Sequence, residues 1–529
     1  MRSLTTYVTL LILFTTSGSL AQTQELADKT GASAPASASK EEVNELRREV
    51  LAQRKTIEEL KEMVRQLAEG KAQVADTGSI PTNLPLGDGV RLVNASLIEQ
   101  AASPAQAAQA DKKPADKKET PLAAGWNGEH FFIRSADGKF QLQPYGYFQS
   151  DYRGYSGDGA PSNTFLIRRA RFGFQGNYGK NYDFAVLADA AAANGQILRD
   201  LYINARVRPE FQVQIGQFKE PFAQETLTAA TNLDFVERSL ASLLYPSAST
   251  AYRSPGITLH GDLSGGIVQW WAGAFNGKGI LATNTTNQPE IIGRLRFYPW
   301  RKKKDSLLQG FAIGGSVGFG RTRGLSNELS FSATMPDSAY TFFPQFRLNG
   351  PTQRYNGEFT WLHGPWGVRA EFDQLNQFRR NVGSEQSDNL GFITLPGIVA
   401  KAGYGQVTYL LTGETRPENG TPKVKSPFLG PEAPGGKGGG LGAWELAFRY
   451  DSIQAHEPGI NLLNNPLTPG FVSTFVNHTD QFTFGVNWYL NYWVKYQVNV
   501  SVDRLKEPSV SGQVPQNFVV LLNRLQFRF

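Results

Sequence analysis

The sequence predicts an all-β fold for residues 125–529, and three observations support this prediction. Apolar and polar residues alternate with a period of two in many short segments, as they do in a strand with one apolar face. Aromatic residues gather near the ends of these segments, for example Tyr298 with Trp300 and Trp361 with Trp366. The last residue, Phe529, ends an alternating apolar segment that has no polar tail.

The alternation is regular enough to assign faces to the predicted strands. In residues 200–208, Leu201, Ile203 and Val207 share one face, whereas Asp200 and Asn204 share the other. The same pattern recurs in residues 444–451, 481–490, 494–503 and 519–529. Each segment therefore has one apolar and one polar face.

Two architectures produce such strands: a soluble antiparallel sandwich with its apolar faces inward, or a membrane barrel with apolar faces toward lipid and a polar lumen. Several segments have about nine to eleven residues, the length that a tilted strand needs to cross hydrocarbon. The aromatic segment ends match interface girdles, and a terminal strand suits a closed barrel in which the last strand pairs with the first. We therefore expect a transmembrane antiparallel β-barrel of about 16 strands around an aqueous channel, preceded by an N-terminal coiled-coil helix.

The composition excludes several classes of protein. The absence of cysteine removes disulfide scaffolds and thiol catalysis, and the five histidines show no metal-ligand spacing. Gly314–Gly318 matches a nucleophile-elbow motif, but Ser316 lies in an alternating segment instead of a strand–turn–helix unit. We therefore expect neither an enzyme nor a cofactor. The net charge of +6 is too small to indicate binding to nucleic acid.

Residues 1–21 have the features of a cleaved secretory signal. A basic start at Arg2 is followed by an apolar stretch from Tyr7 to Phe14 and by the small residues Ser19 and Ala21. The alternative, a membrane anchor, would need an apolar stretch about twice as long. Residues 22–42 form a low-complexity spacer rich in Thr, Ser and Ala.

Residues 43–69 carry a heptad pattern that predicts a coiled coil in the periplasm. Seven of its eight core positions are apolar, which favours self-association over the alternative of a single amphipathic helix lying on a domain. Residues 70–124 lack periodicity and contain five prolines, which predicts a linker. The core positions are Val43, Leu46, Val50, Gln53, Ile57, Leu60, Val64 and Leu67.

Eight short motifs are spread in order over about 360 residues: Ile167–Gly176, Gly216–Phe222, Phe235–Ser239, Arg253–Ile257, Tyr409–Pro417, Gly442–Leu446, Asn487–Asn491 and Leu525–Phe529. Together they resemble the motifs of the phosphate-selective porins O and P of Gram-negative outer membranes. This resemblance implies a trimeric barrel of 16 strands with a loop folded into the lumen and basic residues that guide anions through a constriction. The segment between Phe222 and Tyr252 fits that loop, although it could also be an ordinary extracellular loop.

Alternation also selects residues for the lumen wall. If Phe172 and Phe174 face lipid, then Arg169 and Arg171 face the lumen, and Arg168 lies near a rim or a subunit contact. Arginine suits phosphate because its guanidinium stays charged and donates paired hydrogen bonds. By the same rule, five further arginines are expected to face the lumen: Arg206, Arg208, Arg294, Arg296 and Arg369. Three more basic residues are expected near the constriction: Lys219, Arg238 and Arg253.

The function that follows is passive diffusion of small hydrophilic solutes, with a preference for anions and with phosphate or polyphosphate as candidate solutes. Residues 125–529 contain 38 basic and 31 acidic side chains, a net charge of +7, but these arginines could equally pair with wall carboxylates and hold the shape of the barrel. The expected partners are inorganic anions, outer-membrane lipid, two further copies of the chain and the cell wall through the N-terminal region. The alternative function is a structural anchor that tethers the envelope through the coiled coil.

Overall fold

The computed structural model describes residues 122–126, 130–157, 160–192, 196–244, 252–284, 286–322, 330–334, 336, 341–347, 350–382, 393–429, 439–456, 476–508 and 517–529. All of them belong to the second of two units of the chain, residues 85–529. The predicted signal peptide, spacer and coiled coil, and the linker up to residue 121, lie outside the described residues. No described helix is both long and apolar enough to cross a membrane.

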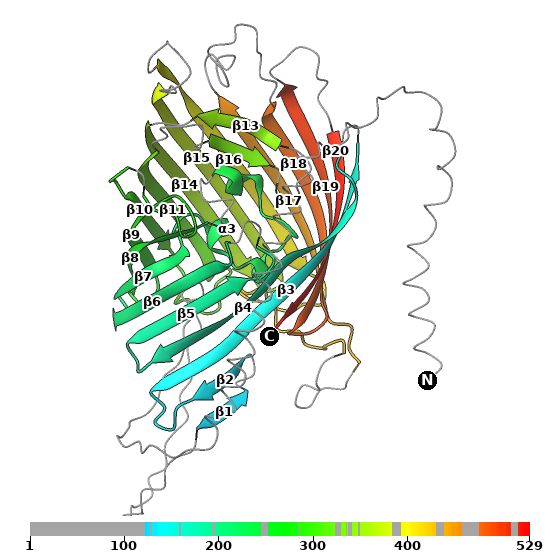
Figure 1. The fold of residues 1–529 in the computed structure, drawn as a ribbon. Helices are drawn as coiled ribbons and strands as arrows, with labels where there is room; N and C mark the ends of the chain where they lie inside the picture. The colour runs from blue at the N-terminus through cyan, green and yellow to red at the C-terminus, as the bar shows by residue number, and fades with distance from the viewer. Residues whose placement is uncertain are drawn as a thin grey trace, which may run out of the picture. The chain divides into compact units, whose positions relative to one another are not determined.

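The described strands form a closed antiparallel barrel (Figure 1). The main sheet has 18 strands, of which the two shortest, β1 (Ala123–Trp126) and β2 (Phe131–Arg134), form a hairpin beside the barrel, so 16 strands make the wall. The sixteen are β3 (Phe140–Ser156), β4 (Thr164–Tyr178), β5 (Tyr182–Asp189), β6 (Leu198–Arg208), β7 (Phe211–Lys219), β8 (Arg253–Leu263), β9 (Val268–Phe275), β10 (Glu290–Phe297), β11 (Gly310–Thr322), β14 (Gly350–His363), β15 (Trp366–Val382), β16 (Ile393–Leu410), β17 (Ala443–His456), β18 (Val476–Tyr489), β19 (Val494–Pro508) and β20 (Asn517–Arg528).

The last strand closes the barrel by pairing with the first. Leu525 of β20 lies opposite Ser150 of β3, and the main chain of Phe529 exchanges two hydrogen bonds with Gly146, at 3.0 and 3.1 Å. The predicted closure through the C-terminal strand and the predicted number of strands are both confirmed. A barrel closed in this way leaves no unpaired strand edge toward lipid.

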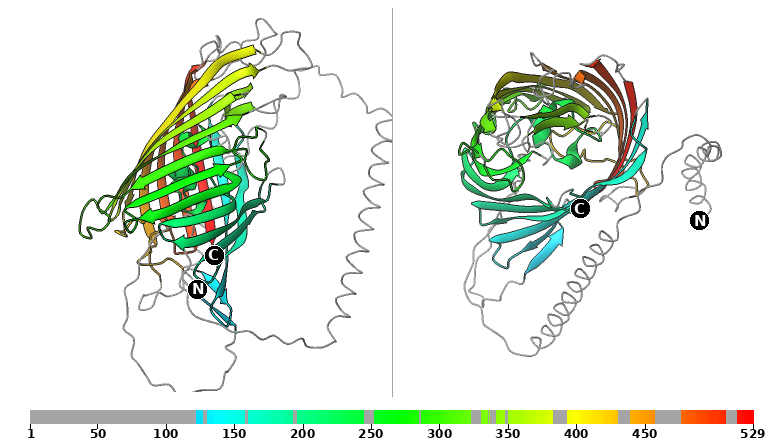
Figure 2. Two further views of the ribbon diagram at one scale, coloured as in Figure 1. Left: turned by 90° about the vertical axis from the view of Figure 1, so that its left-hand side faces the viewer. Right: turned by 45° about the horizontal axis from the view of Figure 1, so that its top comes forward.

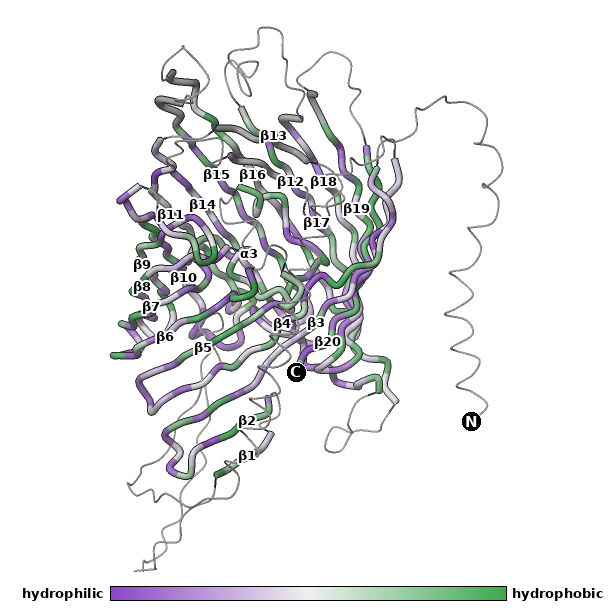
Figure 3. The backbone as a smooth tube through the Cα atoms, in the orientation of Figure 1, coloured by the Kyte–Doolittle hydropathy of each residue, from purple (hydrophilic) through white to green (hydrophobic). Residues whose placement is uncertain are grey.

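Hydrophilic and hydrophobic residues alternate along the wall strands (Figure 3). Over most of the wall the apolar residues are exposed on the outside and the polar residues are buried on the inside, as the alternation predicts. On β6, the outward side chains of Leu201 and Ile203 are 49% and 58% exposed, whereas the inward side chain of Asn204 is 3% exposed. On β19, Lys495, Gln497 and all other inward residues down to Asp503 are buried. The exposed apolar side chains are therefore the surface that contacts hydrocarbon.

The two ends of the barrel differ in their connections. Five of the seven strand connections at one end are short turns, such as residues 209–210 and 364–365, whereas the other end carries longer loops, including one with a small sheet of β12 (Ser330–Thr334) and β13 (Thr341–Arg347). In outer-membrane barrels the short turns face the periplasm and the long loops face outward. The hairpin β1–β2 lies at the periplasmic end, where Trp126 stacks on Trp493 of the turn between β18 and β19, with ring centroids 4.8 Å apart.

At the end with the long loops, part of the wall reverses its polarity. Inward side chains of β15, β16, β17, β19 and β20 are apolar there and form a buried cluster, whereas Gln374, Lys401 and Gln454 point outward. We interpret the outer part of this region, from Lys401 on β16 toward the long loops, as rising above the hydrocarbon. The inward wall residues of the cluster are Leu375, Ile398, Ala400, Ala402, Tyr404, Ile453, Ala455, Leu505, Phe518, Val520 and Leu522.

We predict that Phe484→Arg destabilises the folded barrel in lipid by about 2–4 kcal/mol, since Phe484 is 57% exposed on the outer face of β18 and a cation there would face hydrocarbon. Leu281→Arg is the matched control, because Leu281 is 62% exposed in the loop between β9 and β10, and we expect a change within 0.5 kcal/mol. Reversible unfolding of both variants in lipid vesicles measures the difference. Equal stabilities of the two variants would contradict the assignment of the lipid-facing side.

Candidate functional site

The described part of the connection between β7 and β8, residues 220–244, folds into the lumen (Figure 2, right). It contains three short helical turns, α3 (Gln224–Leu227), η3 (Ala230–Asn232) and η4 (Leu240–Leu244). Several of its apolar residues are buried. Phe222 packs with Phe218, Phe275 and Ile292, whereas Val236 and Leu240 belong to the apolar cluster of the opposite wall. The interpretation of the segment after Phe222 as a lumen loop is therefore confirmed as far as residue 244, and we call residues 220–244 the lumen loop.

Asp234 fixes the tip of the lumen loop to one side of the barrel. Its carboxylate accepts hydrogen bonds from Nη1 of Arg369 on β15, at 2.5 Å, and from Nε2 of Gln406 on β16, at 2.7 Å. It also forms a buried ion pair with Arg416. The main-chain oxygen of Asp234 accepts a further bond from Asn487 of β18, at 2.8 Å.

Glu237 fixes the same loop to a second part of the wall. Its carboxylate lies among three guanidiniums: Arg153 of β3, Arg168 of β4 at 2.8 Å, and Arg524 of β20 at 3.3 Å. Burial by itself raises the pKa of Glu237, but the charges of Arg168, Arg153 and Arg524 hold it well below its usual value. The carboxylate is thus ionised and bound on several sides.

Main-chain groups of the lumen loop add hydrogen bonds to the wall. The amide of Val236 donates to Oδ1 of Asn499 at 2.7 Å, and the amide of Leu240 donates to Oδ1 of Asp451 at 3.1 Å. Buried donors without such acceptors would cost free energy. The loop is therefore a fixed part of the lumen.

A second segment enters the lumen from the periplasmic end. Residues 411–429, the first described part of the connection between β16 and β17, bring Arg416 to Glu445 at 2.8 Å as well as to Asp234. Further along, Glu418 pairs with Arg296 and accepts a hydrogen bond from the hydroxyl of Tyr298 at 2.6 Å. Segments from the two ends of the barrel thus meet inside it through the ion pair of Asp234 and Arg416.

Most of the predicted lumen arginines point inward and pair with a carboxylate. Arg171 lies 2.7 Å from Asp189, Arg206 lies 2.5 Å from Asp183, and Arg253 makes two bonds of 2.8 Å to Asp200. Arg294 and Arg296 share Glu358, at 2.6 and 3.1 Å. These pairs agree with the alternative given in the sequence analysis, in which lumen arginines pair with wall carboxylates and hold the shape of the barrel.

Three of the predicted basic residues have no carboxylate partner among the residues that the structure describes. Arg169 donates to Oε1 of Gln149 at 2.8 Å. Lys219 donates to the carbonyl oxygens of Leu227 and Thr228, at 2.9 and 2.8 Å. Arg238 donates to the carbonyl oxygens of Glu225 and Thr228, the second at 2.6 Å.

Lys219 and Arg238 therefore meet at one acceptor, the carbonyl oxygen of Thr228. Because the two bonds measure 2.8 and 2.6 Å, their donor nitrogens lie no more than 5.4 Å apart. We call these two residues the Thr228 cation pair. Arg253 lies directly across from Lys219 in the pairing of β7 with β8, but its charge is offset by Asp200.

Two arginines differ from the expected placement, and both lie at irregularities of strand pairing. The register of β3 and β4 shifts between Gln149 and Ser150, which leaves Arg168 as an extra residue whose side chain turns to Glu237, so its predicted place at a rim or subunit contact is wrong. A second shift pairs Arg208 with the outward residue Phe211, and Arg208 is exposed at the end of β6 instead of lining the lumen.

Sequence reasoning also missed contributors to the site. Arg416 lies in a connection without periodicity, so no pattern indicated that it enters the lumen. Lys495 was assigned to the polar face of its strand, and its ammonium donates to the carbonyl oxygens of Thr231 and Leu233, at 2.9 and 3.1 Å. No group of three or more His, Cys, Asp or Glu residues suited to a metal ion occurs in the described part of the chain.

Comparison with known proteins agrees with this architecture. Residues 141–529 match the family of phosphate-selective porins O and P. Porin O of Pseudomonas aeruginosa is 24% identical over 390 residues, which cover 69% of this chain and 83% of that protein. The solved structure of an anion-selective porin from Comamonas acidovorans has a TM-score of 0.44 and 9% identity, over 74% of this chain and all of that one. The outer-membrane channel DcaP of Acinetobacter baumannii has a TM-score of 0.44 and 10% identity, over 74% and 97% of the two chains. The chain belongs to the phosphate-selective porin O and P family and is a porin of the outer membrane.

Proposed function

We propose that the porin prefers small anions and that the Thr228 cation pair is the main source of this preference. The single observation that carries the proposal is the sharing of one carbonyl oxygen by Lys219 and Arg238, neither of which has a carboxylate partner in the described structure. Arginines that already pair with aspartate or glutamate contribute little net charge to the lumen. An anion that reaches the base of the lumen loop meets two cations at most 5.4 Å apart.

Phosphate is the solute that this arrangement favours among common anions. A guanidinium donates two parallel hydrogen bonds that match two oxyanion oxygens, and an ammonium adds a compact charge. Arg169 lies on β4 with a neutral partner and supplies another candidate contact along the wall. The family and the fold both indicate a channel and not an enzyme.

We predict that Lys219→Gln and Arg238→Gln each lower the ratio of anion to cation permeability about fivefold. One unit charge about 4 Å from the ion path changes the free energy of the ion by about 1 kcal/mol in water. The reversal potential in a salt gradient across a planar bilayer measures the ratio. Arg208→Gln serves as the control, since Arg208 is exposed at the end of β6, and we expect no change. An unchanged reversal potential in both lumen variants would assign Lys219 and Arg238 a purely structural role.

The lowered pKa of Glu237 makes its ion pairs insensitive to mild acid. Their contribution to the stability of the docked loop is complete above the pKa of a free glutamate, about 4.3, and is lost only as the pH falls through the lowered value. We therefore predict that Glu237→Gln raises the open-channel noise by the same amount at pH 8 and at pH 5, whereas Glu210→Gln, in an exposed turn, raises it at neither pH. A difference between the wild-type channel and Glu237→Gln that disappears between pH 8 and pH 5 would contradict this account.

We also propose that the chain forms a trimer whose periplasmic heptads pair as three parallel helices, and that this region contacts the cell wall. The stacking of Trp126 on Trp493 supports a mechanical role, because it fastens the start of the described chain to the rim of the barrel. This observation favours the second candidate function, an anchor between the outer membrane and the cell wall.

Deletion of residues 22–121 separates transport from anchoring. If the anchor function holds, the deletion leaves the conductance of each barrel unchanged and detaches the outer membrane from the cell wall, which electron microscopy of cells would show. An unchanged envelope would leave transport as the sole function. Native mass spectrometry of the deleted chain measures whether trimers need the heptads.

A further inference from the structure

The outer face of β16 has an open strip at its centre. Tyr404 and Gln406 are buried on the inner side, so Gly403 and Gly405 face outward, and Gly405 is exposed. A Cβ atom on Gly405 would meet no atom within 4 Å. The bulky side chains of Phe372 on β15 and Tyr450 on β17, both at least 40% exposed, bound the strip on its two sides.

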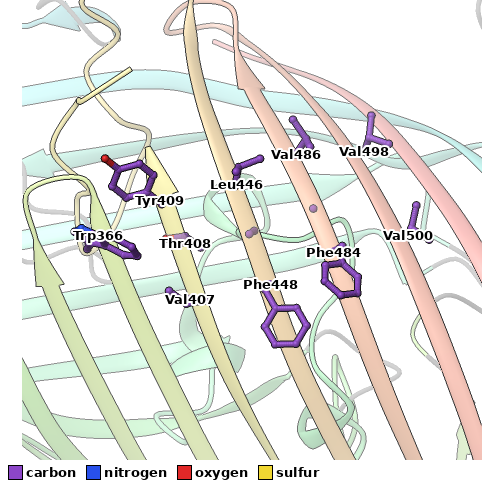
Figure 4. A pocket seen from close by; sticks show the side chains of 12 residues that line it. Trp366, Val407, Thr408, Tyr409, Leu446, Phe448, Phe484, Val486, Val498 and Val500 are labelled. Atoms are coloured by element: carbon purple, nitrogen blue, oxygen red, sulfur yellow. The ribbon is translucent and has the colours of Figure 1, made fainter. Parts of the chain in front are cut away.

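Toward the periplasm this strip continues into an apolar depression of about 410 Å³ on the outside of the barrel (Figure 4). One cross-strand row forms its border on the side of the long loops, from Val407 through Phe448 and Phe484 to Val500. Trp366 and Tyr409 lie at its periplasmic end, with ring centroids 4.5 Å apart. Amphipathic rings of this kind mark the border between hydrocarbon and headgroups.

At the other end of the strip stands Lys401. Its side chain is exposed, and its neighbours on the adjacent strands are Gln374 of β15 and Gln454 of β17. Lys401 makes no hydrogen bond or ion pair with any residue that the structure describes. Eight residues separate Lys401 from Tyr409, about 27 Å along a strand, or about 20 Å of height at a tilt near 40°. This height approaches the roughly 25 Å of an apolar band in outer-membrane barrels. Lys401 therefore marks the outer border of the band, as Tyr409 marks the inner one.

We propose that this strip binds a phosphorylated lipid of the outer leaflet, with one acyl chain along Gly403 and Gly405 and its end in the depression, and with the phosphate on Lys401. A lysine on the membrane-facing side is stabilised by an anionic headgroup, at about 1 kcal/mol per basic residue near such a surface. Arg504, exposed on β19, lies directly across from the carboxylate of Asp480 in the pairing of β18 with β19, so the phosphate contact rests on Lys401.

The shape of the strip favours a lipid over a second copy of the chain. Gly403 lies between Phe372 and the small Ser452, and Gly405 lies between the small Ala370 and Tyr450, so the strip runs diagonally between the two rings and is about two strands wide at each glycine. This width suits hydrocarbon chains but not the face of another barrel. The cation at one end and the apolar depression beyond it match the order of charge and hydrocarbon in one lipid molecule. This inference does not depend on which solute the pore transports.

The test is native mass spectrometry of the full chain in detergent, titrated with bisphosphorylated lipid A and with its dephosphorylated form. We expect the phosphorylated lipid to bind more tightly. Lys401→Gln should weaken its binding about fivefold, the change that about 1 kcal/mol per basic residue implies. Gly405→Leu should reduce the binding of both lipids, since its side chain would fill the strip.

Two control variants keep the test specific. Gly357→Leu fills another outward position with open space, on the far side of Phe372, and Lys303→Gln removes an exposed charge at the opposite rim, so neither should change binding. Equal affinity for the two lipids, or equal loss in Gly357→Leu and Gly405→Leu, would overturn the proposal. A change of oligomeric state in Gly405→Leu would also overturn it, because it would show that another copy covers the strip.

Discussion

The structure depends on one constraint: in hydrocarbon, every backbone amide and carbonyl must find its partner within the protein. The chain meets this constraint by pairing β20 with β3, which turns an open sheet into a closed wall. Closure in turn gives each strand a lipid side and a lumen side, so the period-two alternation becomes a separation of hydrocarbon from water. Charged side chains such as Arg294 are then inside the wall, whereas Leu295 beside it is 62% exposed outside.

Charged side chains that lie close together inside the closed wall need partners of opposite charge. Most of the lumen arginines lie against aspartate or glutamate on a neighbouring strand, and the lumen loop uses the same chemistry at Asp234 and Glu237 to hold its place. In the selectivity proposed above, the contributing cations are those that this network leaves with neutral partners, such as Lys219, Arg238 and Lys495 among the described residues. The Thr228 cation pair stands at the base of the loop, where the wall and the loop meet.

Periodicity made the barrel, its strand number and most inward residues predictable, because side-chain direction alternates strictly along a regular strand. The prediction failed for Arg168 and Arg208, since one extra residue in a strand reverses the face of its neighbours and leaves no mark in the pattern. It could not show the apolar interior at the end with the long loops, because Phe518, Val520 and Leu522 alternate with equally apolar outward residues. Nor could it show which arginines have carboxylate partners, since such pairs join residues on different strands, as Arg294 and Glu358 do.

Glu237 also has a position that bears on the biogenesis of the barrel. Two of its arginine partners, Arg153 and Arg524, lie on the first and last strands of the wall, and Arg524 also binds Asp151 of the first strand at 2.7 Å. The lumen loop thus binds both strands of the closing junction, β3 and β20, which forms only when the C-terminal strand is in place. A barrel without its final strand would lack Arg524, so Glu237 gains its full set of guanidinium partners only after the last strand has paired with the first.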